Sequence, residues 1–507
     1  MKINIEIHKQ YFTISSPSFE QLVTTSYSLT KRLTTYKQDK KYNRFTRRVE
    51  SKFILDKKYF IINYKTEKIH FIFSYIHEVL AYYKNDTNEV NIIEIAPPVG
   101  DDVKLEFNDK YTLRDYQVPF VDKITTTDKP TFLLDVATGD GKTMMATYSM
   151  FKLQKRFAIF ILPRYIDKWI EDLETNMLLT LDDIYIVKGG DSLRRLMAMS
   201  KKELKSIKAI IFSLKTTVSY IKEYLDLDKL FTYTVNPEEL MGHLGIGYSF
   251  NDESHQEFHN VFLLNLVFDV NLFLGITATL VNNQSTVMVK YYSLFPKNER
   301  LINTKKHERY IEVLSFKYRF EYLKKIRSSG PMGYSHIELE KSISRFSSVK
   351  KRYMNLINKV FRVIYVAKSD RVKGDKTLIF VATVSFASDV VEFLQELHPE
   401  YAITKYTAED DYSVIDDNDV IVSTIGSAGT ALDISNLTSV IQTVAIDSVT
   451  ANKQTLGRLR ELKDKRVIFA FIWSPQIPSH FKYSRSREFY FKDKAKFIRV
   501  YTSSEMV

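Results

Sequence analysis

Short apolar segments that alternate with helical stretches are the feature that most constrains the fold of this chain. From about residue 111 these segments read TFLLDVA, FAIFILP, AIIFSL, GYSFNDE and LFLGITAT. Segments that are apolar on both faces are typical of strands in a parallel sheet that helices cover on both sides. After about residue 305 the pattern starts again with YIEVLSFKY, TLIFVAT, DVIVST, SVIQTVAI and RVIFAFIW. The sequence therefore predicts two successive α/β sheets of similar size.

The segment before these sheets has a different composition. Residues 31–60 carry eleven Lys or Arg residues and three acidic ones. Six aromatic residues lie among them. A small core explains these rings better than stacking on nucleic acid, because they adjoin strand-like segments. The six are Tyr36, Tyr42, Phe45, Phe53, Tyr59 and Phe60.

Local patterns in this segment predict a small α+β domain. KFILD and YFIINYK alternate polar and apolar residues and are interpreted as a hairpin, and IHFIFSYIHEVLAYYK has the pattern of an amphipathic helix. APPVG at residues 96–100 is a plausible linker. We expect a basic DNA-binding domain over 1–105, a first α/β lobe over 106–304 and a second lobe over 305–507. The second lobe would contain an inserted helical stretch near 320–368 and a basic C-terminal tail.

The composition limits the other classes of protein. With 507 residues the chain is too long for one hydrophobic core. No apolar run reaches the ~18 residues of a membrane span, the first residues lack a signal-peptide core, and there is no cysteine for disulfides or thiolate chemistry. We expect no membrane partner and a cytoplasmic protein, in the host-cell cytoplasm if it is phage-encoded. The net charge of +12 favours a nucleic-acid partner, although a basic protein without one has the same charge.

The segment DVATGDGKT has the residues of a phosphate-binding loop between a strand and a helix. Gly139 and Gly141 would let backbone N–H groups approach a phosphate, Lys142 would contact the β- and γ-phosphates, and Thr143 would hold Mg²⁺. The six-residue spacing of the strict motif would place Gly where Val136 stands. The order of strand, loop and helix favours a nucleotide site over a chance match.

A second segment, NDESH, follows the strand-like GYSF. Asp252 would hold Mg²⁺, and Glu253 would orient and deprotonate an attacking water. A solvated acidic loop is the alternative. In the second α/β set, QTLGRLRE offers Arg458 and Arg460, either of which could stabilise charge on a transferring phosphoryl group or lie on a basic helix face.

Taken together, these segments resemble the motifs of the superfamily 2 helicases of the DExH type. ATGDGKT matches the short A-T-G-x-G-K-T loop of that family, so Val136 is no departure, and DESH matches the DExH box. TAT matches the S/T-A-T coupling motif, and LRDYQ stands where related motors place an adenine-reading Gln. STIGSAGTALDI resembles a motif of the second lobe that contacts nucleic acid and ribose. QTLGR matches Q-x-x-G-R through Gln454, Gly457 and Arg458.

The resemblance implies an architecture and a set of site residues. The fold would be α/β, with two tandem RecA-like parallel-sheet lobes and a small N-terminal α+β domain, and the chain would hydrolyse ATP with Mg²⁺. Residues for catalysis would be Lys142, Glu253, Gln454, Arg458 and Arg460. Nucleotide would contact Arg114, Gln117, Ala137, Thr138, Gly139, Asp140, Gly141, Lys142, Thr143, Gly429 and Asp433. Mg²⁺ would be held by Thr143 and Asp252, and hydrolysis would be coupled through His255, Thr277 and Thr279.

The last motif departs from the family pattern. The family usually reads Q-x-x-G-R-x-x-R, whereas here Arg460 comes one residue early and Glu461 occupies the usual position. On a helix, one residue turns a side chain by ~100°. Arg458 is therefore the arginine that carries over, and Arg460 is a second candidate.

Within the superfamily, the layout is similar to the UvsW-type phage helicases, in which a small basic domain precedes two motor lobes. That group remodels branched DNA, so the implied partner is DNA with forks or four-way junctions, bound by a monomer. Alternatives are an RNA helicase, a duplex translocase that does not separate strands and, from another class, a non-catalytic DNA-binding scaffold. A motor subunit for a nuclease is disfavoured, because no second acidic cluster with a Lys stands out. The expected nucleic-acid contacts are Lys31, Arg32, Arg44, Arg47, Arg48 and Thr424.

Overall fold

The computed structural model describes most of the chain and divides it into two compact units. The first unit contains the N-terminal sheet together with the first parallel sheet, and the second unit contains the second parallel sheet. The described residues are 1–43, 46, 48–84, 88–136, 139–277, 291–302, 309–331, 333–407, 410, 413–428 and 434–507.

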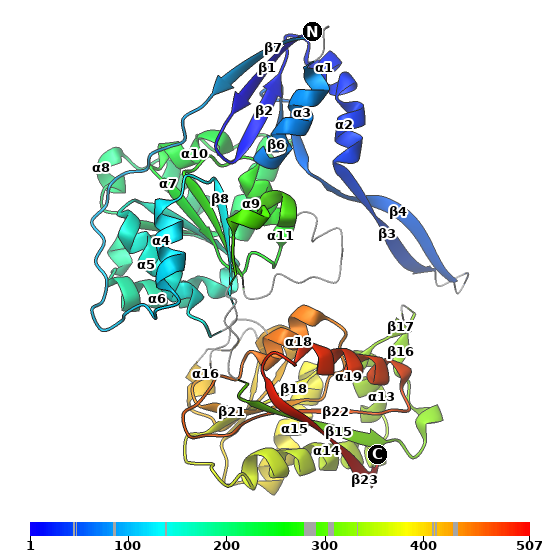
Figure 1. Cartoon of the computed structure of the whole chain (residues 1–507). Helices are drawn as coiled ribbons and strands as arrows, with labels where there is room; N and C mark the ends of the chain where they lie inside the picture. Colours follow the sequence, from blue (N-terminus) through cyan, green and yellow to red (C-terminus); the bar gives the residue numbers. More distant parts are fainter. Residues whose placement is uncertain are drawn as a thin grey trace. The chain divides into compact units, whose positions relative to one another are not determined.

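The N-terminal domain is a five-stranded mixed sheet with three helices (Figure 1). Its strand order is β5-β6-β2-β1-β7, and β1 pairs antiparallel with β2 but parallel with β7. The strands are β1 (Lys2–Ile7), β2 (Tyr11–Ser15), β5 (Phe60–Asn63), β6 (Lys68–Ile72) and β7 (Glu89–Glu94). The helices are α1 (Phe19–Thr25), α2 (Tyr27–Arg32) and α3 (Ile76–Tyr83).

The predicted hairpin between KFILD and YFIINYK is wrong. KFILD lies in β4 (Arg48–Lys58), which pairs with β3 (Thr34–Asn43) in a separate two-stranded sheet (Figure 1). β5 pairs with β6 instead, and the Asn63 side chain accepts hydrogen bonds from the backbone N–H groups of Lys65 and Thr66. An Asn side chain that bonds the backbone just ahead of it stabilises a turn. This turn determines the pairing of β5.

The predicted helix over IHFIFSYIHEVLAYYK is correct only in its second half. Its first residues belong to β6, and the helix α3 begins at Ile76. Ile69 and Phe71 are completely buried between β2 and β5. A short apolar run does not distinguish a buried strand from a buried helix, so the neighbouring strands decide the conformation.

The first lobe is a seven-stranded, all-parallel sheet in the order β10-β11-β9-β12-β13-β8-β14. Successive residues of β8 belong to the hydrophobic cores on opposite faces of the sheet. Phe132 and Leu134 share a core with α5 and α6, whereas Leu133 shares a core with α9 and α11. Helices therefore cover both faces, as the apolar strands predicted. The strands are β8 (Thr131–Asp135), β9 (Phe157–Ile161), β10 (Ile184–Val187), β11 (Ala209–Ser213), β12 (Tyr248–Asn251), β13 (Leu272–Thr277) and β14 (Arg300–Ile302). The helices are α4 (Val118–Thr126), α5 (Lys142–Leu153), α6 (Ile166–Met177), α7 (Gly190–Met197), α8 (Lys201–Leu204), α9 (Leu214–Leu225), α10 (Pro237–His243) and α11 (Phe258–Asn265).

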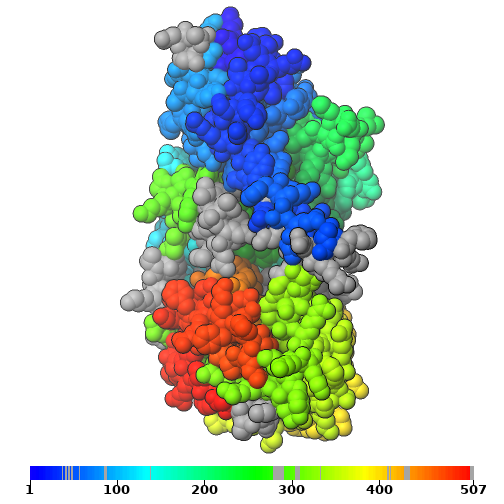
Figure 2. Space-filling view, turned by 90° about the vertical axis from the view of Figure 1, so that its right-hand side faces the viewer, coloured from blue at the N-terminus to red at the C-terminus, as the bar shows by residue number. Residues whose placement is uncertain are grey.

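The N-terminal domain and the first lobe share one hydrophobic core, which explains why they form one unit. Figure 2 shows the N-terminal residues (blue) against the first lobe (green). Polar contacts also join the N-terminal domain to the first lobe. The buried Gln10 accepts from the Val270 N–H (3.1 Å), and Asn63 donates to Glu238 (2.9 Å). Tyr59 meets Phe262 edge to face.

The second lobe is also a seven-stranded, all-parallel sheet, in the order β19-β20-β18-β21-β22-β15-β23. The predicted fold class is thereby confirmed. The segment predicted as a basic tail forms α19 and the edge strand β23. The strands are β15 (Ile311–Arg319), β18 (Lys376–Val381), β19 (Ile403–Tyr406), β20 (Val420–Thr424), β21 (Leu437–Gln442), β22 (Val467–Trp473) and β23 (Ala495–Met506). The helices are α13 (His336–Ser344), α14 (Ser347–Phe361), α15 (Val384–Leu397), α16 (Ser413–Asp416), α17 (Ile425–Ala428), α18 (Val449–Leu456) and α19 (Pro478–Tyr490).

The stretch near 320–368 is only partly helical. It contains the short pair β16 (Ser329–Gly330) and β17 (Gly333–Tyr334) before α13 and α14, and a π-helical turn at Arg362–Val366 after them. None of the helices in the described part of the chain is both long and apolar enough to cross a membrane.

Candidate nucleotide site

Three neighbouring strands of the first lobe end at one edge of the sheet. β13 pairs in parallel with both β8 and β12, and the three strands end at Asp135, Asn251 and Thr277. The phosphate loop follows β8 and the DESH segment follows β12. Open α/β folds bind ligands at the carboxyl edge of a parallel sheet. The predicted residues of the phosphate loop and of the DESH segment meet at this edge.

The loop ends in two glycines with left-handed backbone. Gly139 has φ +97° and Gly141 has φ +75°. Gly141 is the N-cap of α5, which begins at Lys142. A Cβ atom at Gly141 would lie 2.4 Å from Nε2 of Gln117, so no larger residue fits there without a shift. The loop therefore needs glycine for conformation and for space, and it places the N-terminus of α5 toward the site.

Gln117 holds the loop from behind. Its buried side chain accepts from the Arg114 N–H (2.8 Å) and donates to the Asp140 carbonyl (2.8 Å). The Tyr116 hydroxyl donates to the same carbonyl (2.9 Å), and it accepts from the Arg114 guanidinium (3.2 Å). An amide side chain has two N–H donors and two acceptor lone pairs. Gln117 thus retains one of each for another partner.

Lys142 and Glu253 form an ion pair. Lys142 Nζ lies 3.3 Å from Glu253 Oε1, although 111 residues separate them in the sequence. Glu253 adopts φ +49°, a left-handed conformation that is unfavourable for a side chain of this size. Such strain is found preferentially at functional sites. Here it turns the chain sharply after Asp252 and brings the Glu253 carboxylate to Lys142.

Both carboxylate oxygens of Asp252 accept hydrogen bonds. The Trp169 indole Nε1–H donates to Oδ2 (3.0 Å), and the backbone N–H of Glu253 donates to Oδ1 (2.8 Å). Burial, and then the charge of Glu253, raise the pKa of Asp252, whereas Lys142 and the Trp169 hydrogen bond act in the opposite direction. Two neutral donors leave lone pairs on each oxygen for a cation or its water.

His255 connects the DESH segment to the end of β13. Its Nδ1 lies 2.9 Å from Thr277 Oγ1 and 3.2 Å from Glu253 Oε2. Burial is the main cause that lowers the pKa of His255, which favours the neutral imidazole. His255 and Thr277, predicted as coupling residues, are therefore in contact.

Several predicted positions lie outside the described residues. These are Ala137 and Thr138 in the loop, Thr279 after β13, Gly429 and Asp433 after α17, and Arg44 and Arg47 in the basic segment. The backbone of Arg48 belongs to β4.

In the second lobe, the helix that contains the start of the QTLGR motif ends before its arginines. α18 ends at Leu456 with Gly457 as its C-cap, so Arg458 and Arg460 follow the helix. The expected helical rotation between them does not apply. Arg458 is buried, whereas the Arg460 guanidinium donates to the Gly457 carbonyl (3.0 Å). A cation bonded to a terminal carbonyl stabilises the end of a helix. Gln454 lies on α18.

The carboxyl edge of the second sheet carries a cavity of about 580 Å³. Thr424, at the end of β20, lines it with Tyr334, His336 and Tyr483. Thr424 Oγ1 accepts from the Ser427 N–H (3.2 Å) and donates to Ser427 Oγ (2.9 Å). The predicted nucleic-acid contact thus lies at the edge of the sheet, with its hydroxyl engaged at the start of α17.

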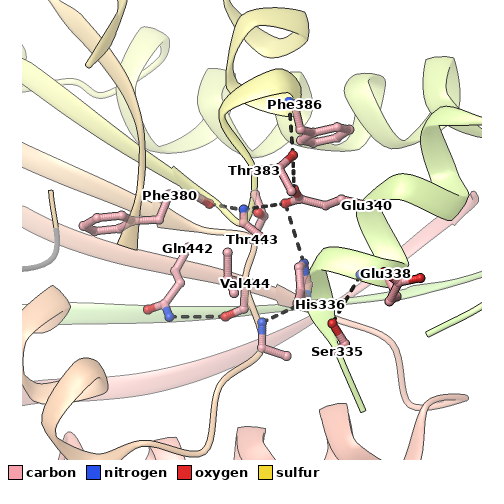
Figure 3. A network of polar contacts seen from close by, with 12 residues as sticks. Ser335, His336, Glu338, Glu340, Phe380, Thr383, Phe386, Gln442, Thr443 and Val444 are labelled. Carbon is pink, nitrogen blue, oxygen red and sulfur yellow. Dashed lines mark hydrogen bonds and ion pairs between the residues drawn. The ribbon is translucent and has the colours of Figure 1, made fainter. Parts of the chain in front are cut away.

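A buried polar network lies beside this cavity (Figure 3). Glu340 accepts from the Ala382 N–H (2.6 Å) and from the Thr383 hydroxyl (3.0 Å), and its Oε1 lies 3.9 Å from His336 Nε2. His336 Nδ1 accepts from the Ala445 N–H (3.2 Å), and the Tyr334 hydroxyl lies between His336 and His480. Burial raises the pKa of Glu340 to about 7 and lowers that of His480 to about 3, and it lowers the pKa of His336 as well.

This network predicts that acidification destabilises the second lobe. From pH 6.5 down to 4.5 the unfolded chain binds protons at His336 and His480 that the folded lobe excludes, while only Glu340 binds a proton preferentially in the folded lobe. The unfolded chain therefore binds one proton more than the folded lobe at these three groups. As a result, they lower the free energy of unfolding by ~1.4 kcal/mol for each unit by which the pH decreases.

The variant Glu340→Gln isolates one of these contributions, because Gln is isosteric with the protonated acid. Its stability should fall more steeply than that of the wild type between pH 6.5 and 4.5, by a further ~1.4 kcal/mol per unit. Scanning calorimetry of the full chain at several pH values measures both slopes. Equal slopes would show that Glu340 is ionised in the folded lobe.

The N-terminal basic residues divide into different environments. Lys31 and Arg32 are exposed on α2, and Arg32 lies 3.8 Å from Glu78. Of the six aromatic residues, Tyr59 and Phe60 are buried, as predicted for a core, whereas Tyr36 and Phe53 on β3 and β4 are 57% and 75% exposed. Tyr42 and Phe45 have no described side chain. The core interpretation is therefore wrong for Tyr36 and Phe53, because the two-stranded sheet is separate from the five-stranded sheet.

The structure also brings residues to the site that the sequence did not predict. Trp169 contacts Asp252, and Tyr116 contacts the loop. Tyr116 stands beside Gln117 in LRDYQ, so its position in the motif was a usable signal. Trp169 gave no such signal, because an aromatic residue on an amphipathic helix normally indicates the core.

The residues present fit a nucleoside triphosphate with Mg²⁺. Gly139 and Gly141 open the backbone, Lys142 provides a cation at the N-terminus of α5, and Thr143 adjoins it. Asp252 keeps acceptor capacity on both oxygens. An arrangement of this kind can bind phosphate and activate a water molecule.

One family model matches the part of the chain that carries this site. Residues 110–282 match the family model described as type III restriction enzyme, res subunit. No curated protein matches the sequence significantly. The structure is similar to S. cerevisiae Dbp5 bound to RNA and ADP BeF3, with 13% identity over 77% of this chain and 90% of that chain and a TM-score of 0.51. A Dbp5 variant bound to Gle1 and IP6 gives 13% identity, 78% and 90% coverage and a TM-score of 0.50.

T4 UvsW is also similar, with 13% identity over 99% of this chain and 100% of its own length and a TM-score of 0.35. The matched residues 110–282 contain the phosphate loop and the DESH segment, and the likeness to the two Dbp5 structures shows the fold.

Proposed function

We propose that this chain is a nucleic-acid-stimulated ATPase that remodels branched DNA, by fork regression and branch migration of four-way junctions. The observation that carries the ATPase assignment is the contact between Lys142 and Glu253, 3.3 Å apart at the carboxyl edge of the first sheet. A phosphate-binding cation and a candidate general base meet there from two separate motifs. Phosphoryl transfer needs this combination of positioning and charge.

ATP binding would release the ion pair. The γ-phosphate competes with Glu253 for the Lys142 ammonium, because a polyphosphate carries more negative charge than one carboxylate. The backbone N–H groups at Gly139 to Gly141 and the N-terminus of α5 would contact the phosphates. Gln117 would read adenine with its remaining donor and acceptor, while its hydrogen bond to the Asp140 carbonyl keeps the side chain in place. Arg114 would also contact the nucleotide.

Hydrolysis would then depend on the freed carboxylate. Glu253 would orient the attacking water and accept its proton. Thr143 and Asp252 would hold Mg²⁺, which supplies neutralisation of the phosphate charge. By the family resemblance, Arg458 would stabilise charge on the transferring phosphoryl group, and Gln454 and Arg460 belong to the same motif. Gly429 and Asp433, in the STIGSAGTALDI segment, would contribute to ribose binding.

Coupling to nucleic acid would run through the contact of His255 with Thr277. The Glu253 carboxylate touches the same imidazole, so a change at the base is transmitted directly to the end of β13. Thr279 follows two residues later. In the second lobe, Thr424 would contact the nucleic-acid backbone.

The N-terminal domain would bind the duplex arms. The two-stranded sheet of β3 and β4 combines exposed aromatic side chains with the densest Lys and Arg content of the chain, and Arg44, Arg47 and Arg48 belong to the same basic segment. Basic residues bind phosphates without regard to sequence, and exposed rings can stack on unpaired bases. Tyr36 and Phe53 would stack at a junction, where bases are accessible, and Lys31 and Arg32 would contact phosphates.

The choice between DNA and RNA needs a direct comparison. Dbp5, which shares the fold, was solved with RNA, so the RNA helicase remains the second candidate. The decisive experiment measures ATPase and strand separation with single-stranded DNA, blunt duplex, fork, four-way junction and RNA at the same nucleotide and salt concentrations. We expect the fork and the junction to give the highest ATPase rate.

Each alternative predicts a different result in this experiment. Stronger stimulation by RNA would favour the RNA helicase. High ATPase on duplex without strand separation or branch migration would indicate a translocase. No hydrolysis on any substrate would indicate a non-catalytic scaffold.

A further inference from the structure

We infer that Trp169 is a positioning residue for the metal site: its indole N–H fixes the Asp252 carboxylate in the orientation that Mg²⁺ requires. This inference rests on the proposed nucleotide site and goes beyond it, because Trp169 belongs to none of the motifs on which that site was predicted. The indole hydrogen bond tunes Mg²⁺ binding, and the indole reports on occupation of the site.

The geometry of the contact is specific. Trp169 Nε1 donates to Oδ2 of Asp252 at 3.0 Å while the Glu253 N–H donates to Oδ1 at 2.8 Å. The two donors come from different elements, α6 and the turn after β12. With one donor on each oxygen the carboxylate cannot rotate about its Cβ–Cγ bond without breaking a hydrogen bond. The plane of the carboxylate is therefore fixed before a cation arrives.

Tryptophan suits this task for two physical reasons. The indole nitrogen is only a donor, so it never competes with Asp252 for the cation. The ring itself cannot move, because Trp169 is 2% exposed and packs in the first-lobe core with Leu173, one face of α6 being buried. Partners that orient a metal ligand typically account for ~10–100-fold in metal affinity or activity.

The chain contains a matched control. It has two tryptophans, and the second, Trp473 on β22, also donates its indole N–H to a side chain, the Ser315 hydroxyl (2.8 Å). Trp473 lies on the sheet of the second lobe, whereas the DESH segment follows a strand of the first-lobe sheet. The two variants Trp169→Phe and Trp473→Phe remove the same kind of donor from a nearly buried ring. Only the first removal touches a proposed metal ligand.

The first measurement is the Mg²⁺ dependence of ADP binding, followed by isothermal titration calorimetry at a series of Mg²⁺ concentrations. We expect Trp169→Phe to need ~10–100-fold more Mg²⁺ than the wild type for half-maximal binding. Trp473→Phe should match the wild type. ADP binding measured in EDTA should be the same in all three proteins, because the phosphate loop is unchanged. A purely structural role of Trp169 would instead weaken binding with and without Mg²⁺.

The second measurement uses the unmutated protein, so it does not depend on whether Trp169→Phe folds. With ¹⁵N-labelled tryptophan, the protein gives two indole N–H signals, assigned from the spectrum of Trp473→Phe. Adding Mg²⁺ to the ADP complex should shift the Trp169 signal and leave the Trp473 signal in place. In Asp252→Asn the Mg²⁺-dependent shift should disappear.

The outcomes separate this inference from the proposed function. If the wild type binds ADP with Mg²⁺ but the Trp169 signal does not respond to Mg²⁺, the positioning role is refuted and the nucleotide site stands. The same holds if Trp169→Phe folds and keeps the wild-type Mg²⁺ dependence. If the wild type binds no ADP at all, the nucleotide site and the role of Trp169 are refuted together.

Discussion

Replacing Glu253 with Gln is expected to lower the nucleic-acid-stimulated ATPase rate by ~10²–10⁴-fold, the usual contribution of a positioned general base. Gln keeps the size of the side chain but cannot accept a proton from water. It also removes the negative partner of Lys142, 3.3 Å away. ADP binding should therefore be retained or tightened, because the phosphates no longer compete with a carboxylate for the ammonium. Steady-state hydrolysis and calorimetric ADP binding measure the two effects separately.

Glu257→Gln is the matched control for this prediction. Glu257 lies four residues further on, also with positive φ, but its carboxylate is exposed and accepts from Asn260 (2.9 Å). It should hydrolyse ATP at the wild-type rate. If Glu253→Gln also kept that rate, Glu253 would not be the base, and the proposed chemistry would have to be assigned to another residue.

Replacing Arg458 with Ala is expected to lower hydrolysis by ~10³–10⁵-fold, the range found for arginines that stabilise a transferring phosphoryl group. The effect should appear in the rate of hydrolysis and leave ADP affinity largely unchanged, because the charge concerned develops only in the transition state. Arg458 is 8% exposed, so a thermal melt must accompany the kinetics. Arg458→Lys retains the charge without the planar guanidinium and should recover only part of the rate.

Arg460→Ala tests which arginine of the motif acts in hydrolysis. The Arg460 guanidinium donates to the Gly457 carbonyl just after α18, so its loss should mainly reduce stability, by up to ~1 kcal/mol for a cation at a helix C-terminus. Hydrolysis should fall far less than in Arg458→Ala. The reverse order of effects would identify Arg460 as the phosphate-facing arginine despite its shifted position.

The motifs of the site could be predicted from sequence because each is a local pattern with a local cause. The loop needs Gly141 for its left-handed φ and for its close approach to Gln117, and a glycine is visible in the sequence. The DESH segment follows a strand, and carboxyl ends of parallel strands share one edge of a sheet. These two facts place Lys142 and Glu253 at the same edge of the sheet, and their contact at 3.3 Å is a feature of the structure.

The failures of prediction occurred where neighbours decide between two local options. Residues Lys68–Ile72 are apolar enough for a helix or a strand, and their position between β2 and β5 makes them a strand. Tyr36 and Phe53 adjoin strand-like segments as Tyr59 and Phe60 do, yet only the latter two reach a core. Sequence patterns state which residues prefer burial, but they do not state which surface is available to cover them.

The sequence by itself determined the two parallel sheets, their helical layers and the motifs at their edges, because hydrophobic periodicity and glycine conformation are local properties. Only the tertiary structure decided which side chains complete the site. Trp169 on α6 reaches Asp252 after β12, 83 residues away, and Gln10 joins the N-terminal domain to Val270 across 260 residues. Such contacts depend on how helices pack on a sheet and on which domain faces share a core. They are properties of the packed chain, and no window of sequence contains both partners.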